Sequence, residues 1–296
     1  MFTLKQMNSI CLTASNVVSG THNASYVYKF PSSAVFGNHS IALAGLTCYS
    51  CVFNVTAALG NNKLSLVIYP ADAYALPYNI VIPDGSYTVD ALNSYFQYYS
   101  IQNGLYMIDA VGSYHYFASF AINAVKYAIE VQTFSIPVNG TFDGLPLGWY
   151  LPSNFPVAVG AGTYWNPVIT FPSGMSEYFG FAAGFSTAPN SGLTTTLAYL
   201  STIAPQINPN PSVLVSVTGI SNKFAVSPII YSFSSAGVAF GSMISEKPNN
   251  LLWCSLNSGT YSEIRVTFLG SDFRPLTMLD PSITMLLAIK PNSSLL

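Results

Sequence analysis

The sequence predicts an all-β protein that folds as an antiparallel sandwich or barrel. Roughly a dozen short segments rich in β-branched and aromatic residues recur at near-regular spacing along the chain, which is typical of this class. Only two segments have helical character, and they do not alternate with the strands as the helices of a parallel sheet do. The third observation is the closing stretch, residues 260–290, which has the pattern of two consecutive strands.

The closing stretch gives the clearest strand signal in the chain. Residues 261–268 alternate between apolar and polar side chains, which is the period of a strand with one buried face. A turn is expected over residues 270–275, because Gly, Asp and Pro favour a reversal. Residues 283–289 are almost uniformly apolar, so we expect a strand buried on both faces. Such a strand has to be inserted into a sheet built from earlier segments, which gives one or two cores closed by the C-terminus.

The predicted elements before the closing stretch are an N-terminal arm, short strands and loops. Residues 1–24, rich in Ser, Asn and Thr, are expected to form an N-terminal arm that is ordered only against a neighbour. A hairpin turn is expected at residues 61–62, and loops are expected over residues 135–167 and 184–212, where Gly, Pro and polar residues gather. The other predicted strands are residues 26–30, 41–46, 51–58, 63–69, 79–82, 105–111, 116–131, 168–171, 213–217, 224–226, 229–233 and 251–256.

Two short helices are expected between the strands. Thr88 or Ser86 can cap a helix over about residues 87–100, and Asp90 in its first turn favours the positive end of the helix dipole. The helical spacing places four residues on a single apolar face: Val89, Leu92, Tyr95 and Phe96. A second, single-turn helix is expected with Ser173 as its cap.

The composition indicates that other subunits cover much of the surface. Charged residues make up 7% of the chain, against roughly a quarter in ordinary globular proteins. Tyr, Ser, Asn and Thr stand where charges normally keep a soluble monomer from associating. The chain has 20 Tyr and 19 Phe, and Tyr is enriched where proteins meet. A secreted β-protein with a neutral surface is the alternative interpretation.

The charge distribution disfavours two classes of partner. The net charge is −2 and the nine basic residues are spread singly, so no cluster is available to neutralise the phosphates of a nucleic acid. No segment has the roughly 18 uninterrupted apolar residues of a membrane-spanning helix. Residues 117–131 come nearest and contain Asn123, Lys126 and Glu130. The N-terminal residues are not interpreted as a signal peptide.

The sequence predicts no catalytic, cofactor-binding or metal site. His22, His39 and His115 are far apart and have no ligand spacing. Cys48 and Cys51 have the spacing of metal and redox pairs, but no second pair accompanies them, so we expect them to be small buried apolar side chains. A cysteine hydrolase built on Cys48 is the remaining enzymatic hypothesis.

Three further groups have both a structural and a functional interpretation. Asp84 and Asp90 fit helix capping better than acid–base chemistry. Aromatic residues of the predicted loop are expected to be buried in a subunit contact, although an exposed cluster could stack on a sugar; they are Trp149, Tyr150, Tyr164 and Trp165. Five Asn-x-Ser/Thr sequons matter only in a secreted chain; they begin at Asn23, Asn38, Asn54, Asn139 and Asn292.

Several phrases, taken in order, resemble a known family. They are FGNHSIAL at residues 36–43, IPDGSYTVDALNSY at 82–95, FPSGMSEYFGF at 171–181, VSPIIYSFS at 226–234 and YSEIRVTF at 261–268, followed by Asp272 and the Pro275–Leu276 pair. In this order they resemble the minor capsid (penton) proteins of virophages and Polinton-type viruses. The resemblance covers about two-thirds of the chain, and its order carries more weight than any single phrase.

The resemblance implies a jelly-roll β-sandwich that assembles as a homopentamer at the twelve five-fold vertices of an icosahedral shell. It also implies contacts with the major capsid protein of the same virus, a location in the virion, and no catalytic residues. A single jelly roll needs well under roughly 200 residues, so we expect an inserted or second β region at about residues 84–185 of a domain that spans residues 25–296. Four Cys without a disulfide pattern suit assembly in the reducing host cytoplasm.

One other function class stays open at this point. A secreted or virion-surface lectin-like β-sandwich could bind glycans by stacking sugars on Trp149 and Trp165. Glycosylation of Asn54 would favour the secreted version of this hypothesis.

Overall fold

The computed structural model describes residues 7–71, 74–135, 147–155, 166–189, 196–208, 210–221, 228–235 and 237–292. The chain divides into two compact units. The first, here called the terminal unit, combines Met1–Phe53 with Asn210–Leu296, and the second, the inserted unit, is Asn54–Pro209. No helix in the described part of the chain is long and apolar enough to cross a membrane.

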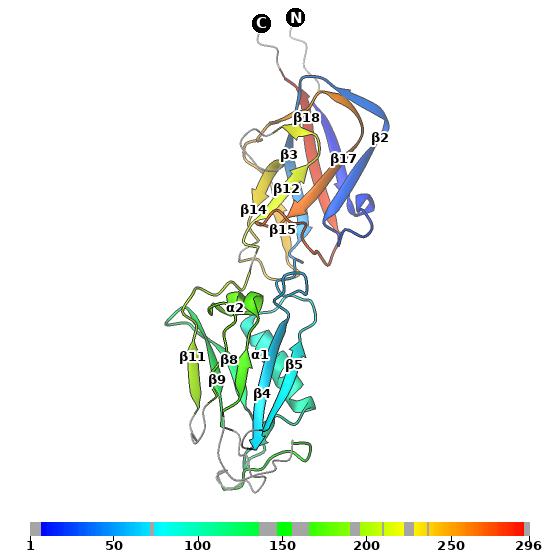
Figure 1. Ribbon diagram of the computed structural model, residues 1–296. Coiled ribbons are helices and arrows are strands. Elements are labelled where there is room, and N and C mark those ends of the chain that lie inside the picture. Colours follow the sequence, from blue (N-terminus) through cyan, green and yellow to red (C-terminus); the bar gives the residue numbers. More distant parts are fainter. Residues whose placement is uncertain are drawn as a thin grey trace, which may run out of the picture. The chain divides into compact units, whose positions relative to one another are not determined.

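The terminal unit consists of two antiparallel sheets (Figure 1). The first sheet has the order β1-β18-β3-β16-β13, and β15 also pairs with β3. Its strands are β1 (Asn8–Thr13), β3 (His39–Tyr49), β13 (Ile220–Ser221), β15 (Met243–Glu246), β16 (Cys254–Leu256) and β18 (Ile283–Pro291). The second sheet has the order β14-β12-β17-β2. Its strands are β2 (Ser25–Phe36), β12 (Val213–Val217), β14 (Ile229–Phe233) and β17 (Gly259–Leu269).

The strand order is that of a jelly roll. Along the chain, β1 enters the first sheet, β2 the second and β3 the first; β12 and β14 return to the second, β15 and β16 to the first. The last two strands then insert between earlier ones, β17 between β2 and β12 and β18 between β1 and β3. This double Greek-key alternation confirms the antiparallel jelly-roll fold.

Strand β18 is inserted as predicted, but it is not buried on both faces. Ile283, Met285 and Leu287 enter the core, whereas Thr284 and Leu286 are exposed, because no described segment covers the outer face of the first sheet there. A register shift between Leu286 and Leu287 ends the alternation, and the three residues from Leu287 to Ile289 are all buried. The sequence therefore suggested burial on both faces because one of the exposed positions, Leu286, carries an apolar side chain.

The core of the terminal unit lies between its two sheets. Tyr26 is fully buried, meets Phe268 edge-on at a ring-centroid distance of 5.9 Å, and donates its hydroxyl to the Pro281 carbonyl at 3.0 Å. Side chains of this size each contribute about 1.5–3 kcal/mol when they are fully buried. Other fully buried members of this core include Leu12, Ile41, Val215, Ile264 and Met285.

The expected N-terminal arm, residues 1–24, is a strand over part of its length. Residues 8–13 form β1, which pairs with β18 from Asn8↔Ile289 to Thr13↔Thr284. Ile10 and Leu12 alternate with exposed neighbours and enter the core, which orders the segment within its own chain. Residues 14–16 follow as a short 3-10 helix, and residues 1–6 lie outside the described part.

The inserted unit combines three small sheets with two helices. The sheets have the orders β10-β4-β5, β11-β9-β8 and β6-β7. The strands are β4 (Lys63–Ala71), β5 (Tyr74–Val81), β6 (Tyr106–Ile108), β7 (Tyr114–Tyr116), β8 (Ala118–Asn123), β9 (Ala128–Thr133), β10 (Val168–Thr170) and β11 (Leu197–Leu200). The insertion was expected at about residues 84–185. The unit begins earlier because β4 and β5 pair with β10, and it ends later because β11 pairs with β9.

Helix α1 (Val89–Gln102) agrees with the prediction, and helix α2 (Ser173–Phe179) differs at its cap. The Thr88 hydroxyl accepts the Ala91 N–H at 3.1 Å, so Thr88 is the cap. Ser173 lies inside the first turn of α2, where it cannot cap, and Pro172 takes the cap position. Inside the helix, the Ser176 hydroxyl donates to the Phe171 carbonyl at 3.1 Å.

Several predicted strands have other boundaries. The single strand expected over residues 116–131 is the end of β7 and a hairpin of β8 and β9, because a turn interrupts it after Asn123. Residues 51–58 form only isolated bridges, at Val52 and Val55. Strand β11 lies in a segment expected to be a loop. The strand expected over residues 224–226 falls outside the described residues.

Candidate functional site: the tyrosine face of the β6–β7 hairpin

The structure does not bring together, in one site, the His, Cys and Asp residues that the sequence offered as candidates for catalysis or metal binding. Among the described residues, no three His, Cys, Asp or Glu side chains are grouped as metal ligands. Cys48 and Cys51 are buried in the terminal core, and burial raises the pKa of the Cys48 thiol to about 12. Such a thiol is protonated near neutral pH and is a poor nucleophile. The pair therefore has the buried, apolar role expected of it.

The two aspartates and two of the histidines also have local roles. Asp84 accepts the Ala57 backbone N–H at 2.8 Å, and Asp90 lies in the first turn of α1. His22 occupies a left-handed backbone position with φ 48°. His39 lies beside Phe36 at a ring-centroid distance of 5.4 Å. None of these arrangements has the geometry of an acid–base pair.

The third histidine belongs to a small three-segment sheet in the inserted unit. Strands β6 and β7 pair antiparallel, with Tyr106 opposite Tyr116 and Met107 opposite His115. Tyr150 adds a third segment, because its N–H and C=O both bond to the backbone of Ile108 at 2.9 Å. Side chains alternate between the two faces of such a sheet, so the register decides which residues share a face.

Four tyrosines share one face, here called the tyrosine face: Tyr106, Tyr114, Tyr116 and Tyr150. The rings of Tyr106 and Tyr114 have centroids 4.8 Å apart, and those of Tyr106 and Tyr116 are 6.4 Å apart. Tyr114 and Tyr150 are 48% and 53% exposed, whereas Tyr106 is nearly buried at the base of the group. The four tyrosines thus form an aromatic cluster in which Tyr114 and Tyr150 are open to solvent.

The opposite face of this sheet anchors it to the inserted unit. The Trp149 ring stacks on His115 at a centroid distance of 4.3 Å, and Trp149 packs against the core of the unit together with Met107. Trp149 is therefore a half-buried structural residue and not an exposed sugar platform. Tyr164 and Trp165, the other predicted aromatics, lie outside the described residues.

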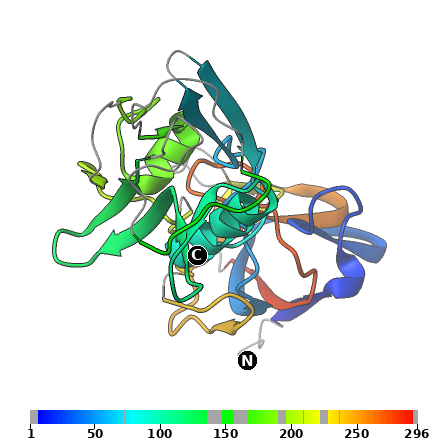
Figure 2. The same ribbon diagram turned by 90° about the horizontal axis from the view of Figure 1, so that it is seen from below.

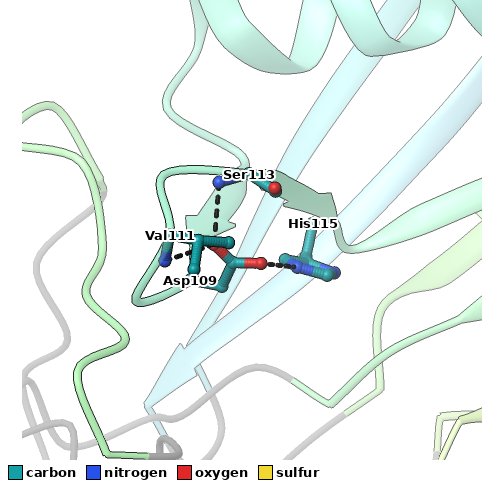
Figure 3. A network of polar contacts seen from close by, with 4 residues as sticks. All are labelled: Asp109, Val111, Ser113 and His115. Atoms are coloured by element: carbon teal, nitrogen blue, oxygen red, sulfur yellow. Dashed lines mark hydrogen bonds and ion pairs between the residues drawn. The ribbon is translucent and has the colours of Figure 1, made fainter.

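Asp109 fixes the turn between β6 and β7 (Figure 3). One carboxylate oxygen accepts the N–H groups of Val111 at 3.0 Å and Ser113 at 2.7 Å, and the other lies 3.0 Å from Nε2 of His115. The hydrogen bond with His115, and then the one from Ser113, lowers the pKa of the Asp109 carboxyl below its usual value. Asp109 and His115 thus lie at the turn of the hairpin and on its anchored face.

The tyrosine face itself is uncharged. Burial, followed by the neighbouring tyrosines, raises the pKa of Tyr106 and of Tyr116, so both phenols are neutral near physiological pH. In the part of the chain that the structure describes, none of the four hydroxyls has a hydrogen-bond partner. The face offers aromatic rings and free hydroxyls without charge.

Of these four residues only Tyr150 was predicted from the sequence as a candidate site residue, and Tyr106, Tyr114 and Tyr116 were not. A signal was present, because the Tyr114-x-Tyr116 spacing places two phenols on the same side of any strand. The partner strand and the third segment could not be inferred, since Tyr150 follows Tyr116 by more than thirty residues in the chain. The long strand predicted over residues 116–131 also hid the hairpin.

Comparisons with known proteins give limited similarity. No protein-family model and no curated protein matches the chain. Among solved structures, the crystal structure of the mavirus penton protein is similar with 11% sequence identity and a TM-score of 0.45, covering 97% of this chain and 100% of that one. A chain in the cryo-electron-microscopy structure of the Sputnik virophage has 9% identity and a TM-score of 0.40, covering 96% of this chain and 98% of that one. The jelly-roll assignment rests on the strand order of this chain.

Proposed function

We propose that the chain is a structural minor capsid protein that forms pentamers at the five-fold vertices of an icosahedral virus shell. It has no enzymatic role in this proposal, and its place is in the virion after assembly in the host cytoplasm. The strand order of the terminal unit is the main support for the proposal. It is that of a jelly roll, which is the fold that the sequence resemblance to penton proteins implies. The phrases that carry the resemblance fall on regular elements of both units: β2, β3, α1, α2, β14 and β17.

An exposed apolar patch on the terminal unit supports assembly. Met243 is 62% exposed and lies opposite Tyr49 across the β15–β3 pair. Phe240 stacks on Phe53 at a centroid distance of 6.5 Å. Backbone hydrogen bonds between Ser50 and the 241–242 segment join these two pairs into one patch. Contiguous exposed apolar surface of this kind marks a site of protein–protein interaction.

The proposed partners are four further copies of the chain and the major capsid protein that surrounds the vertex. Nucleic acid is not a proposed partner, because the chain has only nine dispersed basic residues. The low content of charged residues agrees with a surface that neighbours cover.

Light scattering and electron microscopy of the purified protein test the proposal. We expect five-membered rings, or association that rises with concentration, and we expect Met243→Lys to weaken this association about tenfold or more, because it places a charge in an apolar contact. Tyr98→Lys is the matched control, since Tyr98 is a similarly exposed aromatic residue on α1. A protein that stays monomeric at high concentration, with and without the major capsid protein, would contradict the proposal.

A further inference from the structure

We propose that the tyrosine face binds a neutral carbohydrate. This inference goes beyond the proposed capsid role and does not depend on it, since the face belongs to the inserted unit and carries its own chemistry. The class of ligand follows from four properties of the face: its ring geometry, its free hydroxyls, its charge and its size.

The geometry matches the two-sided chemistry of a sugar. A sugar ring presents C–H groups on its faces and hydroxyls around its rim, so it needs an apolar surface and hydrogen-bonding groups side by side. Tyr114 and Tyr150 offer exposed ring surface, and each phenol carries a hydroxyl that both donates and accepts. The nearly buried Tyr106 supports the ring of Tyr114 from below at 4.8 Å.

The charge of the inserted unit selects against anionic ligands. Residues 54–209 contain two lysines, no arginine and seven acidic residues, which gives a formal net charge of −5. The described tyrosine face has no cation, and the Asp109 carboxylate is held at the turn by His115 and two backbone N–H groups. Sialylated or sulfated glycans, phosphates and nucleic acids would meet an unfavourable field there.

The exposed ring surface of the face has the size of a small ligand. Tyr114 and Tyr150 supply the exposed ring surface, and one tyrosine buries at most about 250 Å², so the face offers about 500 Å² or less. That area suits one or two sugar units.

The anchored side of the hairpin keeps the face in place. The Asp109 hydrogen bonds close the turn, and the His115–Trp149 stack holds the strands against the core. A surface that does not have to be ordered on binding loses less affinity to conformational entropy. The tyrosine face is therefore preorganised for binding.

A glycan array tests the inference with the full-length protein displayed on multivalent beads, so that weak binding is detected. We expect binding to uncharged glycans and weaker binding when the same glycan carries a terminal sialic acid. Titration calorimetry with the best neutral oligosaccharide should then show binding about tenfold weaker for Tyr114→Ala and for Tyr150→Ala. Tyr114→Phe should give a smaller loss, because it keeps the ring and removes the hydroxyl.

Tyr98→Ala, on the exposed surface of α1, is the matched control and should bind as the unmodified protein does. Circular dichroism confirms that each variant is folded. The inference is overturned if no glycan binds, if only anionic glycans bind, or if Tyr114→Ala and Tyr150→Ala leave binding unchanged. None of these outcomes affects the test of assembly, which uses Met243→Lys and measures association.

Discussion

The side chain of Asn54 joins three parts of the inserted unit. Its Nδ2 donates to the carbonyls of Tyr87 and Ile207, both at 2.8 Å, and its Oδ1 accepts the Tyr87 N–H at 2.8 Å. Asn54 is therefore a structural residue of the folded chain. Glycosylation of its sequon would modify this same Nδ2, which is already engaged in two hydrogen bonds. A sequon at Asn23 is used in the same way, since its Nδ2 donates to the Met278 carbonyl at 3.0 Å.

Replacing Asn54 should therefore destabilise the inserted unit. Asn54→Ala removes three hydrogen bonds, and we expect it to lower the free energy of unfolding by about 3 kcal/mol at roughly 1 kcal/mol per bond. Urea unfolding followed by circular dichroism measures the change. Asn8→Ala, at an exposed position of β1, is the control and should have little effect. An equally small change for Asn54→Ala would contradict the structural role of the amide.

Cysteine reactivity should follow burial in the native protein. The thiolate is the reactive form of cysteine, and burial raises the pKa of Cys48 to about 12, whereas Cys11 is exposed on β1. At pH 8 iodoacetamide should modify Cys11 first, and Cys48 at a rate on the order of a thousandfold lower, until the protein is unfolded. Peptide mass spectrometry measures the order of labelling. Selective labelling of native Cys48 would instead revive a cysteine-based activity.

At the scale of elements, the β6–β7 hairpin should respond to acid through Asp109. Its hydrogen bonds lower the carboxyl pKa in the folded state, so their stabilisation is present above the unfolded pKa of about 4 and is lost as the pH falls through the folded value. Asp109→Asn should make the thermal stability less dependent on pH below about 4, because the amide still accepts backbone N–H groups and does not titrate. Melting curves at a series of pH values test this, and identical curves for both proteins would refute it.

The β8–β9 hairpin carries an unusual residue at its turn. In Figure 2 this hairpin, coloured green, extends outward from the rest of its ribbon. Tyr127 has a left-handed backbone with φ 49° and is 87% exposed. Glycine is favoured at such a turn position, and the left-handed conformation costs other residues about 1–2 kcal/mol. The fold gains no burial from this tyrosine.

Tyr127→Gly should therefore raise the free energy of unfolding by about 0.5–1 kcal/mol, the relief of backbone strain less the entropy of a more flexible unfolded chain. Val125→Gly is the matched control. Val125 lies in the same turn and is 91% exposed, but its φ is not positive, so glycine there should lower stability slightly. Chemical unfolding of both variants decides the sign. A loss of stability for Tyr127→Gly would mean that the ring stabilises the fold.

The elements that sequence reasoning predicted correctly are those specified by local chemistry. Helix α1 has its cap, acidic first turn and apolar face within fourteen residues, and β17 has a regular alternation. The β8–β9 turn was missed because its sequence contains no Gly or Pro. The turn is closed instead by the Asn123 side chain, which accepts the Lys126 N–H at 3.2 Å. Strand β1 was missed because its order depends on β18, the far end of the chain. The tyrosine face likewise depends on Tyr150, which only the fold brings to β6.

At the scale of the whole molecule, the described residues form two separate hydrophobic cores. One cluster, around Leu287, draws only on residues of the terminal unit. The other, around Leu66, draws only on residues of the inserted unit. The chain leaves the first unit after β3 and returns to it before β12, so the jelly roll contains all its strands without the insertion. Each core therefore supplies the hydrophobic stabilisation of its own unit.

This division predicts that the two units unfold separately. Leu287 and Leu66 are both almost completely buried, so Leu287→Ala and Leu66→Ala should each cost about 2–5 kcal/mol. Leu287→Ala should speed amide hydrogen exchange in β3, β17 and β18 and leave β4 and β10 unchanged, whereas Leu66→Ala should do the reverse. Exchange measured by mass spectrometry on matched peptides resolves both regions in one experiment. If either substitution accelerated exchange equally in both units, the molecule would unfold as a single cooperative body, and its two cores would not be independent sources of stability.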